Sequence, residues 1–206
     1  MTREDEGNIY NIYKPAGWTP QQAIERLRLM HPEWGSLKIA CAGRLDPMAE
    51  GVLIVLAGDA LKRFDEFCGL DKKYEAEILF GLESDSQDIM GVVREDKELR
   101  HIGKEEIENV LNELKGELKF PVPAYSSWRV QGKALYWWAR QGRLGEIEIP
   151  IHKCLVLSNQ LLGVKNIEVS EVKQWVWERL NVVQGDFRQE KIKAQWESIL
   201  DERQEL

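Results

Sequence analysis

The sequence has few cysteines and histidines, and their positions offer no framework for a disulfide or a metal. Its three cysteines, Cys41, Cys68 and Cys154, are odd in number and far apart, and no CxxC pair occurs. Disulfide-stabilised secreted domains and zinc modules both need an even or closely spaced set of ligands. We therefore expect reduced thiols and no metal.

Long hydrophobic segments are also absent. The longest apolar run, residues 52–57, is far too short to span a bilayer, and the acidic start MTREDEGN lacks the basic and then apolar order of a signal peptide. These two features predict a protein without a membrane partner, located in the cytoplasm.

The third shortage is of positive charge. Lysine and arginine number 28 against 35 aspartates and glutamates, which gives a net charge of −7. Nucleic-acid binding depends largely on Lys and Arg contacts to phosphates, so this balance argues against such a partner. The objection fails if the basic residues gather on one face, because the local field depends on where the charges lie.

What the chain does contain is typical of a globular protein. Hydrophobic residues make up 43% and charged residues 31% of the 206 positions, which predicts a folded chain and, at this length, a single domain over residues 1–206. Apolar periodicity predicts strands at 8–13, 51–58, 74–81 and 146–162, helices at 20–30, 60–67, 103–116, 133–142, 170–180 and 189–204, and a strand and turn at 181–188. The fold class is therefore α+β.

Three predicted helix starts rest on local signals. Thr19, Pro20 and Gln22 form a capping box with proline at the first helical position. Asp59 and Ser170 are predicted as caps of two later helices.

Asp46 is the first candidate for chemistry. It stands in GRLDP, between a glycine-bounded turn and the apolar strand 52–57. A carboxylate at the mouth of an apolar cleft loses hydration and becomes reactive unless a cation holds it ionised. Arg44, or an arginine from elsewhere in the chain, is the predicted cation.

The segment KIACAGRLDPMAEGVLIVLAGDALK resembles the central motif of the TruB-type tRNA pseudouridine synthases, whose Gly-x-Leu-Asp-Pro-x-Ala-x-Gly core stands here at residues 43–51. Segments 13–28, 71–91 and 121–142 are similar to further blocks of that family, in the same order. The four blocks cover roughly the first three quarters of the chain, as a short form without a C-terminal RNA-binding domain.

This resemblance implies an enzyme that isomerises a uridine to pseudouridine in tRNA, at uridine 55 of the T-arm, without cofactor or metal. It also implies the pseudouridine synthase fold: a mixed, mainly antiparallel sheet flanked by helices, with a central RNA-binding cleft, in a monomer. Asp46 matches the catalytic aspartate, and Tyr74 matches the tyrosine that stacks on the target base. Stacking of a flipped base on an aromatic ring is worth about 1–3 kcal/mol.

Four further residues are assigned to substrate binding. Lys14 belongs to the Lys-Pro-x-Gly segment, and Cys41 stands where many members carry a histidine. Arg44 occupies a position that is usually small and hydroxylated, and a Gly-Arg-Leu-Asp spelling resembles ribosomal pseudouridine synthases. Arg188, in GDFRQ, is the hypothetical counterpart of the family's late basic residue, which pairs with the catalytic aspartate.

Thirteen of the 28 basic residues lie in or beside the four blocks, and this placement predicts a basic face for RNA. They are Lys14, Arg26, Arg28, Lys38, Arg44, Lys62, Arg63, Lys72, Lys73, Arg129, Lys133, Arg140 and Arg143. The acidic surplus lies largely in the N-terminal tail, the helix near Glu105 and the last helix.

Three alternatives remain open. The enzyme could modify another RNA site, or the chain could be a non-catalytic RNA-binding or RNA-folding protein with the same fold. A hydrolase that uses Asp46 with a second carboxylate is the third, although no recognisable motif places that second acid.

Overall fold

The structure is a computed structural model that describes residues 8–95 and 102–202. The chain divides into two compact units: Met1–Glu77 with Trp175–Phe187, and Ile78–Gln174 with Arg188–Leu206. The single domain over residues 1–206 stays a prediction.

The elements alternate between strands and helices, which confirms the α+β class. The first unit contains β1 (Ile9–Lys14), α1 (Pro20–Met30), η1 (Pro32–Trp34), β2 (Ile39–Ala42), β3 (Gly51–Ala57), η2 (Gly58–Arg63) and α2 (Phe64–Cys68). The second contains β4 (Leu82–Ser84), β5 (Val93–Glu95), α3 (Lys104–Glu113), β6 (Gly116–Pro121), β7 (Arg129–Val130), β8 (Lys133–Ala134), α4 (Leu135–Arg140), η3 (Leu144–Glu146), β9 (Ile151–Val156) and α6 (Gln189–Asp201). Helix α5 (Val169–Val182) contributes residues to both units.

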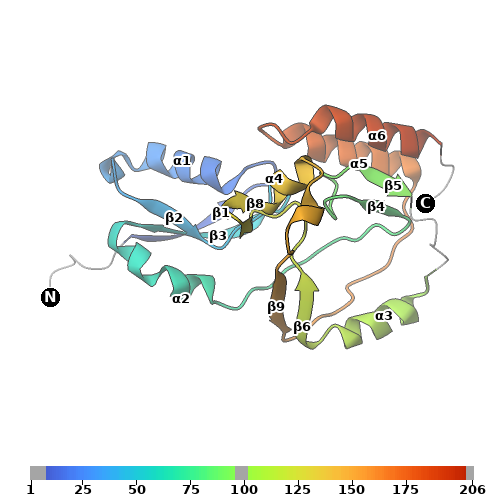
Figure 1. Ribbon diagram of the computed structural model, residues 1–206, viewed down its shortest axis with the longest axis horizontal. Helices are drawn as coiled ribbons and strands as arrows, with labels where there is room; N and C mark the ends of the chain where they lie inside the picture. The colour runs from blue at the N-terminus through green and yellow to red at the C-terminus, as the bar shows by residue number, and fades with distance from the viewer. Residues whose placement is uncertain (1–7, 96–101, 203–206) are drawn as a thin grey trace. The chain divides into compact units, whose positions relative to one another are not determined.

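The first unit is built on a three-stranded antiparallel sheet in the order β1-β3-β2. Helix α1 covers one face, where Leu27 packs with Leu53 and Val55. On the other face Leu56 packs with Ala60, while Phe64 adds to the same cluster. Figure 1 shows α1 and α2 on opposite sides of this sheet. Leu53 and residues 55–57 of β3 are buried because β3 is the central strand and has a helix on each side.

Helix α1 begins as its sequence predicts. The Gln22 N–H donates to Thr19 Oγ1 at 3.2 Å, and the Thr19 N–H donates to Gln22 Oε1 at 2.7 Å. Pro20 takes the first helical position, where its missing N–H costs nothing. The two other predicted caps are wrong: Asp59 lies inside η2, and Ser170 lies inside α5.

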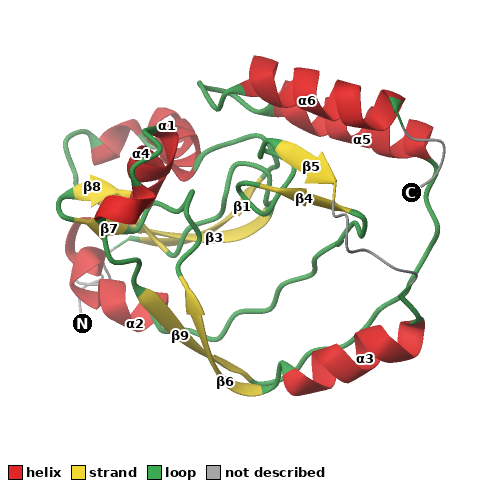
Figure 2. Cartoon of the chain, turned by 45° about the vertical axis from the view of Figure 1, so that its right-hand side comes forward, coloured by secondary structure: helices red, strands yellow, loops and turns green. Residues whose placement is uncertain are grey.

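The second unit contains three short antiparallel sheets, β4-β5, β6-β9 and β7-β8, joined by long irregular segments (Figure 2). Helix α6 packs on β5, and its buried face includes Ile192, Trp196 and Leu200. The Trp196 Nε1–H donates to the Ile89 carbonyl at 3.2 Å, which ties the helix to the turn between β4 and β5.

Two predicted strands are wrong. Residues 71–79 have no regular secondary structure, and the side chains of Tyr74 and Ile78 are 71% and 75% exposed. The alternation is present, but a strand also needs a neighbour for its backbone hydrogen bonds, and no described strand pairs with this segment. At 181–188 helix α5 continues to Val182, and a turn through Gly185 follows.

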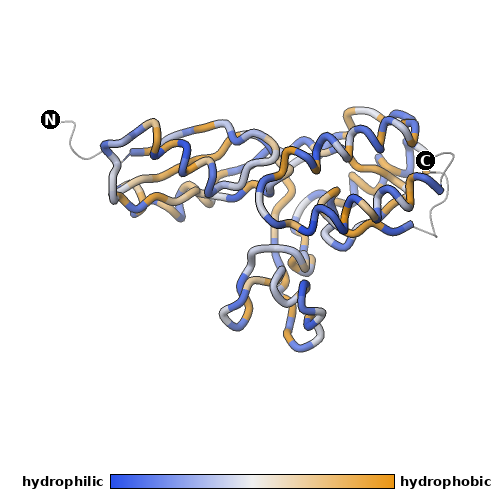
Figure 3. The backbone as a smooth tube through the Cα atoms, turned by 90° about the horizontal axis from the view of Figure 1, so that it is seen from above, coloured by the Kyte–Doolittle hydropathy of each residue, from blue (hydrophilic) through white to orange (hydrophobic). Residues whose placement is uncertain are grey.

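The predicted single sheet is also not observed, because the described strands form four separate sheets. All of their pairings are antiparallel, as predicted. None of the helices in the described part of the chain has the length and hydrophobicity needed to cross a membrane. Figure 3 shows hydrophobic stretches that are short and interrupted by hydrophilic ones.

The backbone of Gly17 lies so close to the backbone of Val182 that no residue with a side chain fits at position 17. Its φ is +87°, and a Cβ atom there would lie 2.4 Å from the backbone oxygen of Val182. Gly43, in the same unit, has φ +98° but nothing within 4 Å of its missing Cβ. The two glycines therefore share the backbone strain of a left-handed residue and differ in the clash.

We predict that Gly17→Ala lowers the free energy of unfolding by about 3 kcal/mol or more, from strain and clash together. Gly43→Ala, with strain alone, lowers it by about 1–2 kcal/mol. Urea unfolding followed by tryptophan fluorescence measures both. Equal losses in the two variants would contradict the close approach of Gly17 to Val182.

Candidate functional site

Asp46 lies in the loop that joins β2 to β3. The loop leaves β2 through Gly43, whose φ is +98°, and the Ala49 N–H donates to the Asp46 carbonyl at 3.0 Å, closing a turn. The Asp46 side chain is exposed. The predicted desolvation of this carboxylate is therefore not found, because no apolar wall covers it within the described first unit.

The loop is tied down by the ammonium of Lys14, which is completely buried. Its Nζ donates to the carbonyls of Trp18 at 2.7 Å, Pro15 at 3.0 Å and Pro47 at 3.4 Å. The Gly17 N–H also donates to the Pro47 carbonyl, at 2.7 Å. Two segments more than thirty residues apart thus share one cation, and Pro47 directly follows Asp46.

The charge of Lys14 is coupled to the candidate catalytic acid. Burial lowers the pKa of Lys14 from its ordinary value of 10.5, and the negative charges of Asp46 and then Glu50 act in the opposite direction. The role of Lys14 in the structure is to hold the loop, since its three donors are used on backbone oxygens. Its assignment to substrate binding stays a prediction.

Three other predicted residues lie in the first unit without converging on Asp46. Cys41 packs in the cluster beneath α1, and burial raises the pKa of its thiol to about 11 against the opposing charge of Arg44. The Arg44 side chain is exposed. Tyr74 makes no hydrogen bond or ring contact with any described residue. Their roles at the site stay predictions.

Arg188 belongs to the second unit, where it precedes α6 in a left-handed conformation with φ +66°. Its Nη1 donates to Asp85 Oδ2 and to the Tyr125 hydroxyl, both at 2.9 Å, and its Nη2 lies 3.3 Å from Asp85 Oδ1. The guanidinium also stacks on the Tyr125 ring, with Cζ 4.4 Å from the ring centre. The Tyr125 hydroxyl donates to Asp85 Oδ2 at 2.8 Å and closes the triangle.

The carboxylate at the centre of this triangle is held in its charged form. Burial opposes the charge of Asp85, but hydrogen bonds from Arg188, Tyr125 and the Val92 N–H outweigh it and lower the pKa of the carboxyl. Burial and the adjacent Asp85 raise the pKa of Tyr125, which keeps its hydroxyl a donor. The geometry gives Arg188 a fixed orientation.

Asp85 and Tyr125 were not among the predicted site residues. The available signal was their position within two of the matched blocks, 71–91 and 121–142. The pairing of Arg188 with Asp46, which belongs to the other unit, stays a prediction.

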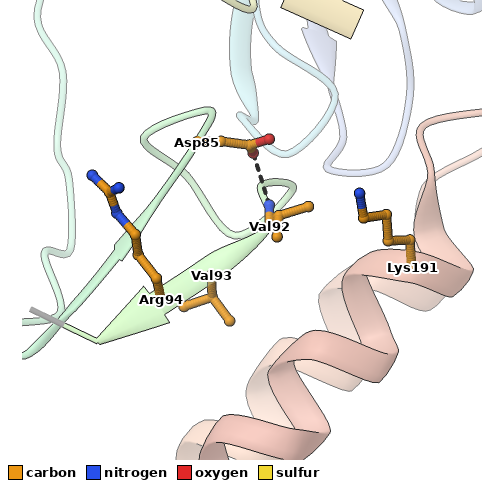
Figure 4. Close-up of a pocket in the computed structure, with 5 residues that line it drawn as sticks. All are labelled: Asp85, Val92, Val93, Arg94 and Lys191. Carbon is orange, nitrogen blue, oxygen red and sulfur yellow. Dashed lines mark hydrogen bonds between the residues drawn. The ribbon is translucent and has the colours of Figure 1, made fainter. Parts of the chain in front are cut away.

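Asp85 also lines a pocket of about 310 Å³ together with Val92, Val93, Arg94 and Lys191 (Figure 4). The two cationic side chains lie on either side of Val92 in this view. Arg94 is paired with Glu83 at 2.7 Å, on the neighbouring strand. The pocket is open and small, and it lies within the second unit.

Cations and aromatic rings alternate along the β7-β8 hairpin and α4. Lys133 Nζ lies 5.2 Å and Arg143 Cζ 5.7 Å from the ring centre of Trp137. Arg140 Cζ lies 6.0 Å from the ring of Tyr136. Such a surface attracts phosphates and offers faces on which bases stack. Arg143 is also paired with Glu146, whose Oε2 lies 2.6 Å from its Nη2.

Other basic residues named from the sequence are already engaged. Arg28 donates to the carbonyls of Gly35 and Leu37, both at 2.8 Å. Lys62 pairs with Asp59, at 2.8 Å. The single basic face stays a prediction, and the acidic tail at residues 1–7 lies outside the described residues. Across residues 8–95 and 102–202, no three His, Cys, Asp or Glu side chains are grouped to hold a metal ion.

Comparison with known proteins identifies related chains. Residues 29–174 match the model of the family described as "TruB family pseudouridylate synthase (N terminal domain)". The tRNA pseudouridine synthase B of Caldicellulosiruptor saccharolyticus is 37% identical over 158 residues, 75% of this chain and 52% of the relative. That of Caldanaerobacter subterraneus is 36% identical over 154 residues, 75% and 52% of the two chains. That of Bacteroides fragilis is 34% identical over 169 residues, 81% and 68%. The chain spans about half the length of the first two relatives.

The coupling of Lys14 to the loop predicts a measurable titration. Both Asp46→Asn and Glu50→Gln lower the pKa of Lys14 below its value in the wild type. The decrease is larger in Asp46→Asn, because the Asp46 charge raises this pKa more than the Glu50 charge does. NMR of ¹³C-labelled lysine measures these shifts. No change in Asp46→Asn would contradict the proximity of the two charges.

The same lowered pKa gives a pH dependence of stability. Between the folded pKa of Lys14 and its ordinary 10.5, the unfolded chain binds more protons than the folded one, so stability rises with pH through this window. The rise is smaller in Lys14→Met. This variant also loses about 2 kcal/mol or more at neutral pH, because the carbonyls of Pro15 and Trp18 lose their donor. Urea unfolding at several pH values measures both effects.

Proposed function

Because the chain belongs to the TruB family of pseudouridylate synthases, we propose that it isomerises a uridine to pseudouridine in tRNA, with uridine 55 of the T-arm as the first candidate. The observation that carries the proposal is the match over residues 29–174, within which Asp46 stands on a loop fixed by Lys14. We further propose that the enzyme acts as a cytoplasmic monomer.

In the proposed reaction, the Asp46 carboxylate acts on the nucleoside while the bond between C1′ and N1 breaks. The uracil turns in place, C5 bonds to C1′, C5 loses its proton and N1 gains one, so that the product is an isomer of the substrate. The detached base must be kept from water during the turn, and stacking on Tyr74 serves this purpose. Its ring is exposed and therefore available to a base.

The remaining predicted residues contribute to RNA binding. Arg44 is exposed on the Asp46 loop and reaches a phosphate or a base, while Lys14 holds the loop from beneath. Cys41 belongs to β2, the strand that precedes the loop. The cations and rings of the β7-β8 hairpin and α4 bind further nucleotides. A central RNA-binding cleft is part of the proposal.

One observation favours a second candidate function. The Asp46 carboxylate is exposed, and the Tyr74 side chain is 71% exposed, so neither group is held ready for chemistry in the described unit. A non-catalytic RNA-binding or RNA-folding protein would need neither. Modification of another RNA site is the third possibility, favoured by the Gly-Arg-Leu-Asp spelling at 43–46.

The purified protein is predicted to form pseudouridine in an unmodified tRNA transcript, mapped by carbodiimide treatment and reverse transcription. Asp46→Asn lowers the rate by roughly a thousandfold or more, because the reacting carboxylate is lost. Asp59→Asn, an acid-to-amide change at another exposed position of the same unit, keeps the rate. RNA binding without product in the wild type would favour the non-catalytic alternative.

Arg188 is proposed to pair with Asp46 during the reaction. Arg188→Ala and Arg188→Lys are then both predicted to lower turnover by roughly tenfold or more, since lysine cannot reproduce the planar, bidentate guanidinium. Tyr125→Phe keeps the Arg188 guanidinium but removes the hydroxyl to which it donates. This variant tests whether the orientation of Arg188 affects turnover. Full turnover in both Arg188 variants would remove this residue from the site.

A further inference from the structure

Two lysines face each other on the two-stranded ribbon that β6 and β9 form in the second unit (Figure 2). The register places Lys119 directly opposite Lys153. Directly opposite residues of an antiparallel pair share one face, with Cβ atoms roughly 4.5–5.5 Å apart. Both residues are exposed, and neither ammonium group has a hydrogen bond or an ion pair with any described residue. Like charges in this arrangement destabilise a sheet, so the free protein gains no stability from this pair.

The whole face of the ribbon that carries the two lysines is open. By register and alternation its other residues are Glu117, Pro121, Ile151 and Leu155. All six positions are exposed, with Ile151 and Leu155 at 56% and 61%. Glu117 makes no ion pair with a residue that the structure describes. The face therefore carries more positive than negative charge, and both ammonium groups are available to an anion.

The opposite face of the ribbon is partly filled by the protein's own rings. The rings of Phe120 and His152, which are partners in the register, lie 5.3 Å apart, and the ring of Trp128 lies 6.2 Å from that of His152. The Val122 N–H donates to the Pro150 carbonyl at 2.9 Å, so the chain stays paired just beyond the ribbon. The lysine face is thus the one that remains open to a partner.

We propose that Lys119 and Lys153 bind neighbouring phosphates of the RNA backbone. Bound phosphates replace the repulsion between the two ammonium groups by attraction, which accounts for a like-charge pair that lowers the stability of the free protein. Phosphates carry no sequence information, so these contacts add affinity and fix the position of the RNA on the second unit. The inference rests on the proposed function, because it presumes an RNA substrate.

Charge decides between RNA and other occupants of this face. An apolar partner that covered Ile151 and Leu155 would also take water from two ammonium groups and leave them unpaired, which is costly. Lysines on exposed strands discourage pairing with a second chain, but lysines at unopposed positions would do so without the repulsion. Anionic lipid headgroups would also meet the two charges. The proposed function supplies an RNA and no lipid.

The test measures affinity for the tRNA transcript by fluorescence anisotropy at several salt concentrations. Lys119→Gln and Lys153→Gln are each expected to lower the slope of log affinity against log salt by roughly 0.7–1, the loss of one phosphate contact. An unrelated RNA hairpin shows the same loss, since phosphate contacts do not depend on sequence. Lys104→Gln is the matched control. It removes an equal charge from the same unit, but Lys104 is paired with Glu108 at 3.6 Å, so the wild-type slope is kept.

Lys153→Glu is expected to give two opposite results in one protein. In the free protein the new carboxylate faces Lys119, so the unfolding equilibrium constant falls by roughly twofold to fivefold. Affinity for RNA falls further than in Lys153→Gln, because the carboxylate repels the phosphate. A misfolded variant would lose stability together with affinity, so the two readouts separate loss of the contact from loss of the fold.

The outcomes separate the inference from the proposed function. Wild-type affinity and salt slope in both glutamine variants would overturn the phosphate site even if pseudouridine is formed, and so would variants that only aggregate. Weaker binding of the variants to phosphatidylglycerol vesicles, with unchanged binding to RNA, would assign the lysines to lipid and overturn the site. Weaker RNA binding in variants of a protein that forms no pseudouridine would support the site and contradict the proposed activity. A wild type that binds no RNA would overturn both.

Discussion

The first unit depends on one buried ammonium group. Lys14 leaves β1 at its last residue and binds carbonyls from its own loop and from the turn that carries Asp46. A buried charge is stable only when its hydrogen-bonding capacity is used, and three backbone oxygens use it here. The arrangement explains why a lysine, not an aliphatic residue, ends a strand whose inner face is apolar.

This anchoring separates two tasks that one loop must perform. The backbone around Pro47 is held from below by Lys14 and Gly17, while the Asp46 side chain remains exposed above it. In the proposed reaction, a substrate meets a carboxylate whose backbone is already positioned, and binding does not need to order the loop. In the proposed complex, the substrate itself would cover the exposed Asp46 carboxylate.

Local signals predicted the first unit well. The start of α1 follows from Thr19, Pro20 and Gln22 alone, because a capping box satisfies its own donors within four residues. The buried strand β3 follows from an apolar run between two glycines. The motif at 43–51 located the candidate acid, since the identity of the residues carried that information without the fold.

Pairings between distant segments were not predictable. The alternation at 74–80 indicated a strand, but a strand exists only where a second one offers hydrogen bonds, and sequence alone does not show that partner. The same holds for Arg188, whose contacts with Asp85 and Tyr125 span 103 and 63 positions. Both partners were visible as residues of matched blocks, yet nothing in their spacing linked them to residue 188.

The irregular segment at 74–80 has a consequence for the behaviour of the protein in concentrated solution. No described strand pairs with this segment, and its apolar residues alternate as those of a sheet edge do, so two copies could join there and begin to aggregate. Glu75 and Glu77 lie within the same stretch, and their like charges repel a second copy. Because salt screens such repulsion, these two glutamates act as gatekeepers whose protection weakens as ionic strength rises.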